Sequence, residues 1–473
     1  MSRNTAQVLM AVVAVVAVAF LLRWYYVVTA MVDHPLRGDA TQHYYYAWNL
    51  LNHHVFSMAT PGAELATPDS YRAPGYPLLV AAWMAIADDF DRWYAGVLLT
   101  QCILGALAAG ITVLLARFWL PLGWSLFAGL LAAVWPHSVT IAGCLLSETL
   151  YGFLMLLGML LYGSMLKTRM VKVAASAGLC FGLAILVNPV LLPMVVLLPL
   201  AALWRGDASR RALLAFAICA SSLPVSWEVR TALLPASGLS SRDRAFQNLV
   251  HGSWPGFNAA WRESVALEPD RARIMPLGDQ DAGMNSGRQK LAPIEREEQA
   301  MLRSPKGGLA MLGDRFLASP AVYLKWYLVQ KPALLWGWDI QIGQGEIYVY
   351  PTENSPFETM PSLRALVSLC HGLNPILGIG ALIAAIVAIV RRRLPSVLAG
   401  ALNSDGAPIL CATAWLLAYV TAMHTLLQSE PRYSIPYRPF EVMLAATALA
   451  WLVALWRHRR TLQPAANGES GRE

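Results

Sequence analysis

Charged residues are scarce in this chain of 473 residues. Only 14% of them are Asp, Glu, Lys or Arg, whereas 56% are hydrophobic, and the mean hydropathy is +0.46. A typical soluble domain carries about 25% charged residues, so this composition excludes an ordinary soluble protein. Several apolar stretches approach the roughly 20 residues that a helix needs to cross a bilayer. The sequence therefore predicts an integral membrane protein.

Cysteine is also rare, and an internal repeat is missing. A thiol inside an apolar run behaves as a small hydrophobic side chain, which argues against a disulfide framework, a metal cluster and redox chemistry. Without a repeat, a transporter built from two inverted halves is disfavoured. All six cysteines lie in apolar runs: Cys102, Cys144, Cys180, Cys219, Cys370 and Cys411.

The positive charges indicate membrane orientation rather than nucleic-acid binding, although the formal net charge is +7. They lie mainly in short loops beside apolar runs, as cytoplasmic loops of membrane proteins do. Apolar spans are expected at residues 8–30, 95–116, 123–142, 147–166, 173–187, 190–204, 212–233, 365–390, 408–427 and 439–456. We therefore predict an all-α polytopic protein with about ten transmembrane helices, within a range of about nine to twelve. A bacterial-type inner membrane, with the N-terminus in the cytoplasm, is the expected location.

Two long segments, 31–92 and 235–364, then share the extracytoplasmic side. The first apolar run continues past Leu22 to Val32, so we expect an uncleaved anchor rather than a signal peptide. Residues 75–88 are too short for a span and suit an interfacial helix. The predicted units are an N-terminal transmembrane catalytic module (1–234), a small extracytoplasmic loop domain with an interfacial helix (235–364), C-terminal transmembrane helices (365–460) and a cytoplasmic tail (461–473).

Asp39, in the stretch RGDATQHYYYAWNLL, is the first candidate for chemistry. A carboxylate beside a bilayer loses solvation, so it needs a cation, a metal or a reaction that uses its charge. The alternative is that Asp39 caps the following helix, since Asp commonly does so. Arg72, in YRAPGYP, presents a guanidinium able to hold a phosphate. It is equally suited to pairing with lipid head groups.

Three further charged residues lie at the predicted outer surface. Glu148 follows Ser147 at the start of a span, where first-turn acids favour the helix dipole. Arg230 ends the seventh span, and Arg432 precedes the last one. Singly, both arginines are ordinary snorkelling residues. Together with Asp39 and Arg72 they come from five separated segments that the predicted topology brings to one membrane surface.

The order of these elements resembles the GT-C superfamily of membrane glycosyltransferases. It is most similar to the branch of protein O-mannosyltransferase-like and lipid A aminoarabinose transferase-like enzymes. The resemblance covers nearly the whole chain, although each element alone is weakly specific. The matching elements are Asp39, the Tyr44–Leu51 helix, the Arg72–Pro77 turn, Ser147 with Glu148 and Leu150, Pro224 with Trp227 and Arg230, and Arg432 with Tyr433 and Pro436.

The resemblance implies an inverting transfer of a sugar from a polyprenyl-phosphate donor to an acceptor hydroxyl at the extracytoplasmic face. Asp39 would then be the general base, with Glu148 as a second catalytic carboxylate. The donor phosphate would meet Arg72, Arg432 and Arg230. The acceptor is a glycan, a lipid or a protein. Substrate contacts are expected from Tyr44, Tyr76 and Tyr433.

Two questions stay open at the level of sequence. A divalent metal is allowed because some members of the superfamily use one, yet no ligand spacing demands it. A transporter or flippase of a lipid-linked sugar is the alternative function. That alternative predicts ionisable residues at mid-depth in the bilayer, whereas the acidic residues here gather at one face.

Overall fold

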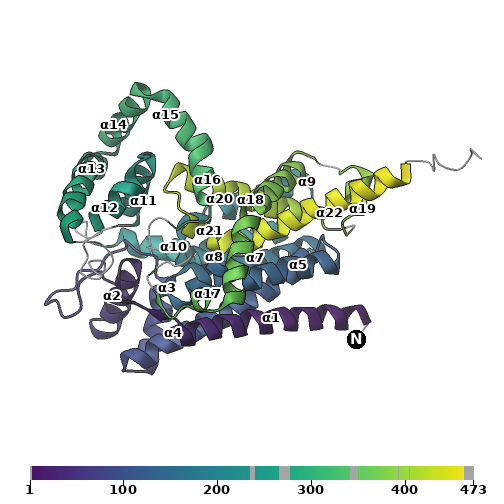
Figure 1. The fold of residues 1–473 in the computed structure, drawn as a ribbon, viewed down its shortest axis with the longest axis horizontal. Helices are drawn as coiled ribbons and strands as arrows, with labels where there is room; N and C mark the ends of the chain where they lie inside the picture. Colours follow the sequence, from purple (N-terminus) through teal and green to yellow (C-terminus); the bar gives the residue numbers. More distant parts are fainter. Residues whose placement is uncertain are drawn as a thin grey trace, which may run out of the picture.

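The computed structural model describes residues 3–234, 240–265, 277–340, 350, 352–391, 394–403 and 405–462, and these are almost entirely helical (Figure 1). Two short strands, β1 (Met31–Val32) and β2 (Thr352–Glu353), pair antiparallel, with Met31 opposite Glu353 and Val32 opposite Thr352. The pair joins the first outer segment to the second. Residues 463–473 of the expected cytoplasmic tail lie outside the described residues.

All ten predicted spans coincide with helices. Within the described residues, seven candidate spans are long and apolar enough to cross a membrane, and an eighth is added if one bent pair counts. Six of the seven are single helices: α1 (Arg3–Thr29), α4 (Phe90–Ala116), α7 (Glu148–Thr168), α10 (Arg210–Ala232), α18 (Pro361–Val390) and α20 (Ala407–Leu426). The last candidate span comprises α21 (Pro431–Ser434), η4 (Ile435–Tyr437) and most of α22 (Arg438–Leu462).

The remaining predicted spans are bent or short. Helix α5 (Leu122–Val134) meets α6 (Pro136–Thr140) and η1 (Ile141–Gly143) at a 56° bend. Trp135 lies at this break with an extended ψ of 118°, just before Pro136, and a residue before proline is pushed out of the α region. Helices α8 (Val171–Val187) and α9 (Met194–Arg205, preceded by η2, Pro189–Leu191) are shorter apolar helices. The all-α polytopic membrane fold is confirmed.

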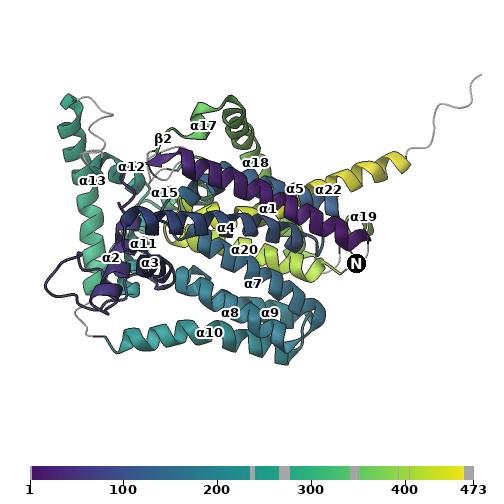
Figure 2. The same cartoon turned by 90° about the horizontal axis from the view of Figure 1, so that it is seen from below.

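Close packing of the bundle depends on small side chains. A Cβ added at Gly178 of α8 would lie 2.4 Å from the carbonyl oxygen of Phe216 on α10, so only glycine permits this approach. Figure 2 shows α8, α9 and α10 side by side along one flank. All six cysteines are free, and none of them forms a disulfide.

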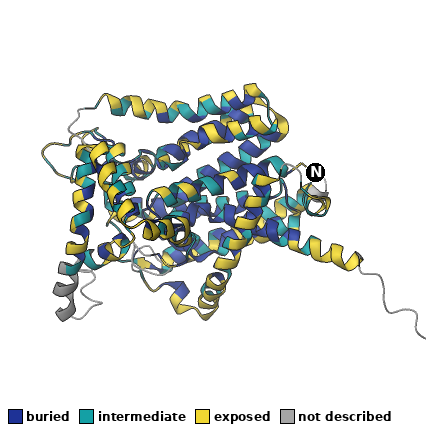
Figure 3. Ribbon diagram, turned by 90° about the horizontal axis from the view of Figure 1, so that it is seen from above, coloured by how far each residue is buried: buried dark blue, intermediate teal, exposed yellow. Residues whose placement is uncertain are grey.

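The outward faces of the bundle are apolar. Four apolar side chains of α10 are exposed: Leu214, Ile218, Val225 and Val229. Figure 3 shows exposed stretches, in yellow, along the outlying helices. An apolar face this exposed would be unstable in water but matches lipid. The chain is therefore a multi-pass membrane protein.

Non-spanning helices gather at the end of the bundle opposite the N-terminus (Figure 1). In the first outer segment they are α2 (Asp39–Asn52) and α3 (Gly75–Ile86), the latter being the predicted short helix. In the second they are α11 (Ser241–Ser253), α12 (Phe257–Val265), α13 (Leu277–Arg303), α14 (Pro305–Ala318), α15 (Pro320–Lys325), η3 (Trp326–Gln330), α16 (Lys331–Leu335) and α17 (Pro356–Thr359). Helix α19 (Ser396–Gly400) follows α18.

Candidate active site

Asp39 lies at the first position of α2 and is not its cap. The N-cap residue is Gly38, which has a positive φ of 56° and makes no side-chain cap hydrogen bond. Glycine adopts this conformation without the penalty of a Cβ. The Tyr350 hydroxyl donates a 3.0 Å hydrogen bond to the Arg37 carbonyl and fixes the turn from the second outer segment. The capping alternative is therefore wrong, and the Asp39 carboxylate is left for other partners.

Two guanidiniums from distant segments hold that carboxylate. Arg72 donates to Asp39 Oδ1, while Arg432 Nη2 lies 2.8 Å from Asp39 Oδ2. The Asp39 side chain keeps 27% of its surface exposed, whereas those of Arg72 and Arg432 are 7% and 11% exposed. The Asp39 side chain is therefore more exposed than either of the two arginines that pair with it.

Glu148 joins this cluster through Arg432. Its Oε1 lies 3.5 Å from Arg432 Nε, so one guanidinium bridges the two carboxylates. Ser147 is the N-cap of α7 but makes no capping hydrogen bond. Asp39, Arg72, Glu148 and Arg432 thus form one cluster, which we call the Asp39 cluster. The sequence predicted that five segments would meet at one membrane surface, and the structure brings four of them together in this cluster.

Close backbone contacts position the two arginines. A Cβ added at Gly75, at the start of α3, would lie 2.8 Å from the Leu186 carbonyl oxygen on α8. Gly75 is therefore needed for close approach, rather than for an unusual backbone angle. Near Arg432, a Cβ at Gly252 of α11 would lie 1.9 Å from the Leu427 carbonyl oxygen. The Lys331 ammonium donates to the carbonyls of both residues and so fixes the loop that leads to Arg432.

The charge balance keeps Asp39 ionised. Burial alone would raise the pKa of its carboxyl, but Arg72 and then Arg432 lower it further than burial raises it, with help from Arg244. The resulting pKa lies well below the ordinary range for aspartate. An opposite charge within hydrogen-bonding distance favours the charged form in this way.

Arg244 is a third cation at the site, and the sequence did not single it out. It comes from α11 and lies with its Cζ 5.8 Å from the centre of the Tyr71 ring. Burial lowers its pKa to about 10, with Arg72 adding to the effect and Asp39 opposing it. Among the described residues its guanidinium has no hydrogen-bond or ion-pair partner. In the sequence, Arg244 was recognisable only as a basic residue on a helix with a capping motif.

A hydrogen-bonded chain links the cluster to the outer helices. Tyr71, next to Arg72, donates a 2.6 Å hydrogen bond to Gln247. Gln247 donates in turn to Glu298 at 3.0 Å, and His251 lies 2.9 Å from the other oxygen of that carboxylate. The second outer segment therefore contributes the Arg244 guanidinium and also Gln247, which accepts the hydrogen bond from Tyr71.

The structure does not bring Arg230 into the Asp39 cluster. Its Nη1 donates to the Asp69 carbonyl at 2.7 Å, and Nη2 lies 3.5 Å from the Phe56 carbonyl oxygen. The guanidinium also lies 4.6 Å above the ring of Trp227. These contacts tie α10 to the first outer loop, so Arg230 holds the loop that carries Arg72.

The three predicted tyrosines are placed differently. Tyr433 lies at the cluster, with its ring centre 5.4 Å from Arg432 Cζ. Tyr76 is buried and donates to Gln101 at 2.8 Å, with its ring against His43. Tyr44 stacks on Trp93, with ring centres 5.9 Å apart. Only Tyr433 directly contacts a residue of the cluster.

The cluster is a poor metal site as it stands. Within the described part of the chain, no group of three or more His, Cys, Asp and Glu side chains is arranged to hold a metal ion. Both oxygens of Asp39 already accept from arginines, and positive neighbours oppose a second cation. A divalent ion would have to displace at least one guanidinium, so we derive no step through a metal.

Solved structures share this architecture, although no family model and no curated protein sequence matches the chain. The archaeal oligosaccharyltransferase AglB from Archaeoglobus fulgidus, in complex with an inhibitory peptide and a dolichol-phosphate, superimposes with a TM-score of 0.50 at 14% identity. That match covers 100% of this chain and 53% of AglB. The chain has the GT-C fold.

Two further structures are similar. The apo form of the Archaeoglobus fulgidus enzyme matches with a TM-score of 0.50 at 15% identity, over 98% of this chain and 53% of that one. ArnT from Cupriavidus metallidurans bound to undecaprenyl phosphate matches with a TM-score of 0.34 at 13% identity. That match covers 96% of this chain and 78% of ArnT. The chain thus spans about half the length of the oligosaccharyltransferase. The branch within the superfamily stays a prediction.

Proposed function

We propose that this chain is an inverting glycosyltransferase that moves a sugar from a polyprenyl-phosphate donor to an acceptor hydroxyl. The observation that carries the proposal is the ionised, partly exposed Asp39 carboxylate held between Arg72 and Arg432. A base beside a cluster of guanidiniums is what transfer from a phosphate leaving group needs. The AglB structure, which contains a dolichol-phosphate, supports a lipid-phosphate donor on the same fold.

The proposed reaction accounts for each bond that forms or breaks and for the proton of the acceptor. The acceptor oxygen attacks the anomeric carbon, its proton passes to Asp39, and the bond between that carbon and the phosphate oxygen breaks. The lipid phosphate leaves with the electron pair. The phosphate charge is received by the two paired arginines and by Arg244, which has no hydrogen-bond or ion-pair partner among the described residues. Glu148 keeps Arg432 in place through their 3.5 Å contact.

The paired arginines also explain how a carboxylate of low pKa becomes a base. While Arg72 and Arg432 both hold Asp39, its pKa lies well below the ordinary range, and such a carboxylate takes protons poorly. A donor phosphate competes for the same guanidiniums. Donor binding therefore weakens their hold on Asp39 and raises its basicity when the acceptor needs it. In this proposal the two arginines couple donor binding to proton transfer.

The remaining residues have supporting roles. Tyr433 contacts Arg432 and lines the donor side, while Tyr76 and Tyr44 position α2 and α3 through their buried partners. Arg230 positions the first outer loop. The site is proposed to face the extracytoplasmic side of a bacterial-type inner membrane. This end lies opposite the expected cytoplasmic loops, and the acceptor is a glycan, a lipid or a protein.

Asp39→Asn tests the proposal because it keeps the shape of the side chain and removes its charge. Sugar transfer should fall by about 10²–10⁴-fold, the usual contribution of a general base, while the amount of protein in the membrane stays near normal. Near-normal transfer by this variant would remove Asp39 as the base. Transport of a labelled lipid without a new glycosidic bond would instead support a flippase.

A further inference from the structure

Helix α2 holds the first outer loop through a stripe of polar side chains. They recur at intervals of three or four residues and so share one face of the helix: Asp39, Gln42, Tyr46 and Asn49. Asn49 donates to the Ser57 carbonyl at 3.0 Å, and Tyr46 donates to the Asp69 carboxylate. Asp69 in turn accepts from the backbone N–H of Tyr71 at 3.1 Å. The stripe therefore fixes the loop as far as Tyr71, next to the first arginine of the Asp39 cluster.

Gln42 extends this support to the guanidinium of Arg72. Arg72 Nε donates to Gln42 Oε1 at 2.5 Å, and Arg72 Nη2 donates to Asp39 Oδ1. Nε and Nη2 form one edge of the planar guanidinium, so an amide and a carboxylate three residues apart on α2 fill that edge together. Nη1 lies on the other edge. It has no hydrogen-bond partner among the described residues and keeps some accessible surface.

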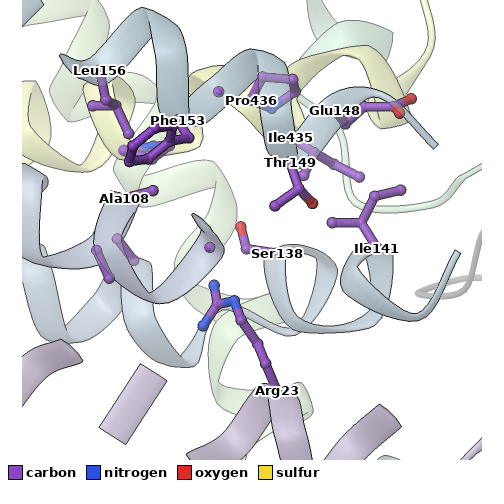
Figure 4. Close-up of a pocket in the computed structure, with 15 residues that line it drawn as sticks. Arg23, Ala108, Ser138, Ile141, Glu148, Thr149, Phe153, Leu156, Ile435 and Pro436 are labelled. Carbon is purple, nitrogen blue, oxygen red and sulfur yellow. The ribbon is translucent and has the colours of Figure 1, made fainter. Parts of the chain in front are cut away.

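The two arginines that pair with Asp39 differ in their second anchor. Arg432 Nε lies 3.5 Å from Glu148 Oε1, and Figure 4 shows the Glu148 carboxylate pointing away from the pocket between α1 and α7. Arg72 has the Gln42 amide instead of a second carboxylate. An amide oxygen accepts a hydrogen bond without adding negative charge. Arg72 is therefore held as firmly as Arg432 but keeps more of its positive charge for an anion.

The direction of the Gln42 amide follows from the same contact. A guanidinium has only donors, so the oxygen of the amide, and not its nitrogen, must face Arg72 Nε. A hydrocarbon side chain at this position would leave Nε without its partner. The guanidinium would then have one anchor, Asp39 Oδ1, and could turn about it.

We propose that Gln42 is a positioning residue for the donor: it holds the Nε edge of Arg72 so that the Nη1 edge is presented to the lipid phosphate. This role rests on the proposed function, in which Arg72 receives that phosphate. Two parallel hydrogen bonds from a fixed guanidinium edge bind a phosphate more tightly than one bond from a mobile edge. Gln42 therefore acts through Arg72 and does not itself contact the reacting atoms.

A double-mutant cycle tests this role by measuring the Kd of undecaprenyl phosphate with isothermal titration calorimetry in detergent. Gln42→Met keeps the length of the side chain and removes the acceptor, so it should raise Kd about tenfold, the value of one charge-assisted hydrogen bond. Arg72→Gln should raise Kd at least as far. The double variant should bind no more weakly than Arg72→Gln alone, because two residues that act through one contact are not additive.

Thr41→Val is the matched control, because Thr41 is the adjacent residue of α2 and is half-buried like Gln42. It should leave Kd unchanged. A wild-type Kd for Gln42→Met would overturn the role of Gln42. A further tenfold weakening in the double variant would also overturn it, since a general structural defect adds to the loss of Arg72. Either result leaves the proposed function standing, whereas wild-type protein that binds no undecaprenyl phosphate would overturn both.

Discussion

Arg432 and Arg438 lie six residues apart on one segment, and their ion pairs differ in how far they are exposed. Arg438 Nη1 lies 2.8 Å from Glu441 and donates to Asn374 at 2.8 Å, while Nη2 donates to the Gly337 carbonyl at 2.7 Å. Its side chain and that of Glu441 are 3% and 1% exposed. The cluster around Arg438 is closed.

The Asp39 cluster is open by comparison. Arg432 also meets a carboxylate at 2.8 Å, but that carboxylate keeps 27% of its surface exposed. Unpartnered buried atoms do not separate the two clusters, because Glu148 Oε2, Glu441 Oε1 and Arg438 Nε all lack a hydrogen-bond partner among the described residues. The difference is therefore one of exposure: the Asp39 side chain is 27% exposed and that of Glu441 is 1% exposed. The same residue types thus serve the fold at Arg438 and are available for chemistry at Arg432.

The largest effects are expected when Arg438 and Arg432 are each replaced by glutamine in separate variants. Arg438→Gln should lower the free energy of unfolding by about 3–5 kcal/mol, because Glu441 is left as an uncompensated buried charge. Arg432→Gln should cost less stability, since Asp39 is partly hydrated, but it should lower transfer by about 10²-fold. Thermal unfolding in detergent and transfer per folded molecule measure the two effects. If both variants lose only stability, or both lose only transfer, the distinction is wrong.

A smaller effect is expected at Arg244. Arg244→Gln should raise the KM for the lipid-phosphate donor by about tenfold, the value of one charge-assisted hydrogen bond, and change kcat less. Arg242→Gln is the matched control, because Arg242 lies on the same helix, is exposed and contacts Phe246 instead. Steady-state kinetics at varied donor concentration separates the two. Equal donor KM values for both variants would exclude Arg244 from the donor site.

The smallest expected effect is a shift in pH dependence. Arg72 and Arg432 hold the pKa of Asp39 below the ordinary aspartate range, so kcat/KM should fall only when the pH drops below that range. Arg72→Gln removes one positive charge, which raises the pKa and moves the acid limb to higher pH. The kcat/KM profile reports ionisation of the free enzyme. An unchanged acid limb would show that Arg72 does not control this carboxylate.

The ion pairs of Asp39 also determine how the stability of the folded protein changes with pH. Because the pKa of Asp39 is lower in the folded protein than in the unfolded chain, its contribution is present above the unfolded pKa. That contribution is lost as the pH falls through the folded value. The Asp39 cluster therefore contributes to stability at neutral pH and ceases to do so in acid.

Local sequence patterns were enough to predict the spans and most of the cluster. Hydropathy predicted α1, α4 and α7, and charge at the span ends predicted that Asp39, Arg72, Glu148 and Arg432 would meet. Arg230 lies at a span end too, yet its guanidinium binds the first outer loop. Arg244 was missed because a basic residue on a surface helix looks the same whether it faces solvent or a carboxylate.

The sequence by itself determined which segments enter the membrane and which stay at one end, because the cost of burying polar groups in lipid depends on local composition. Only the tertiary structure decided which arginines reach Asp39. The direction of a guanidinium depends on contacts between distant segments, such as the approach of Gly252 to the Leu427 carbonyl and of Gly75 to α8. No local pattern encodes those contacts.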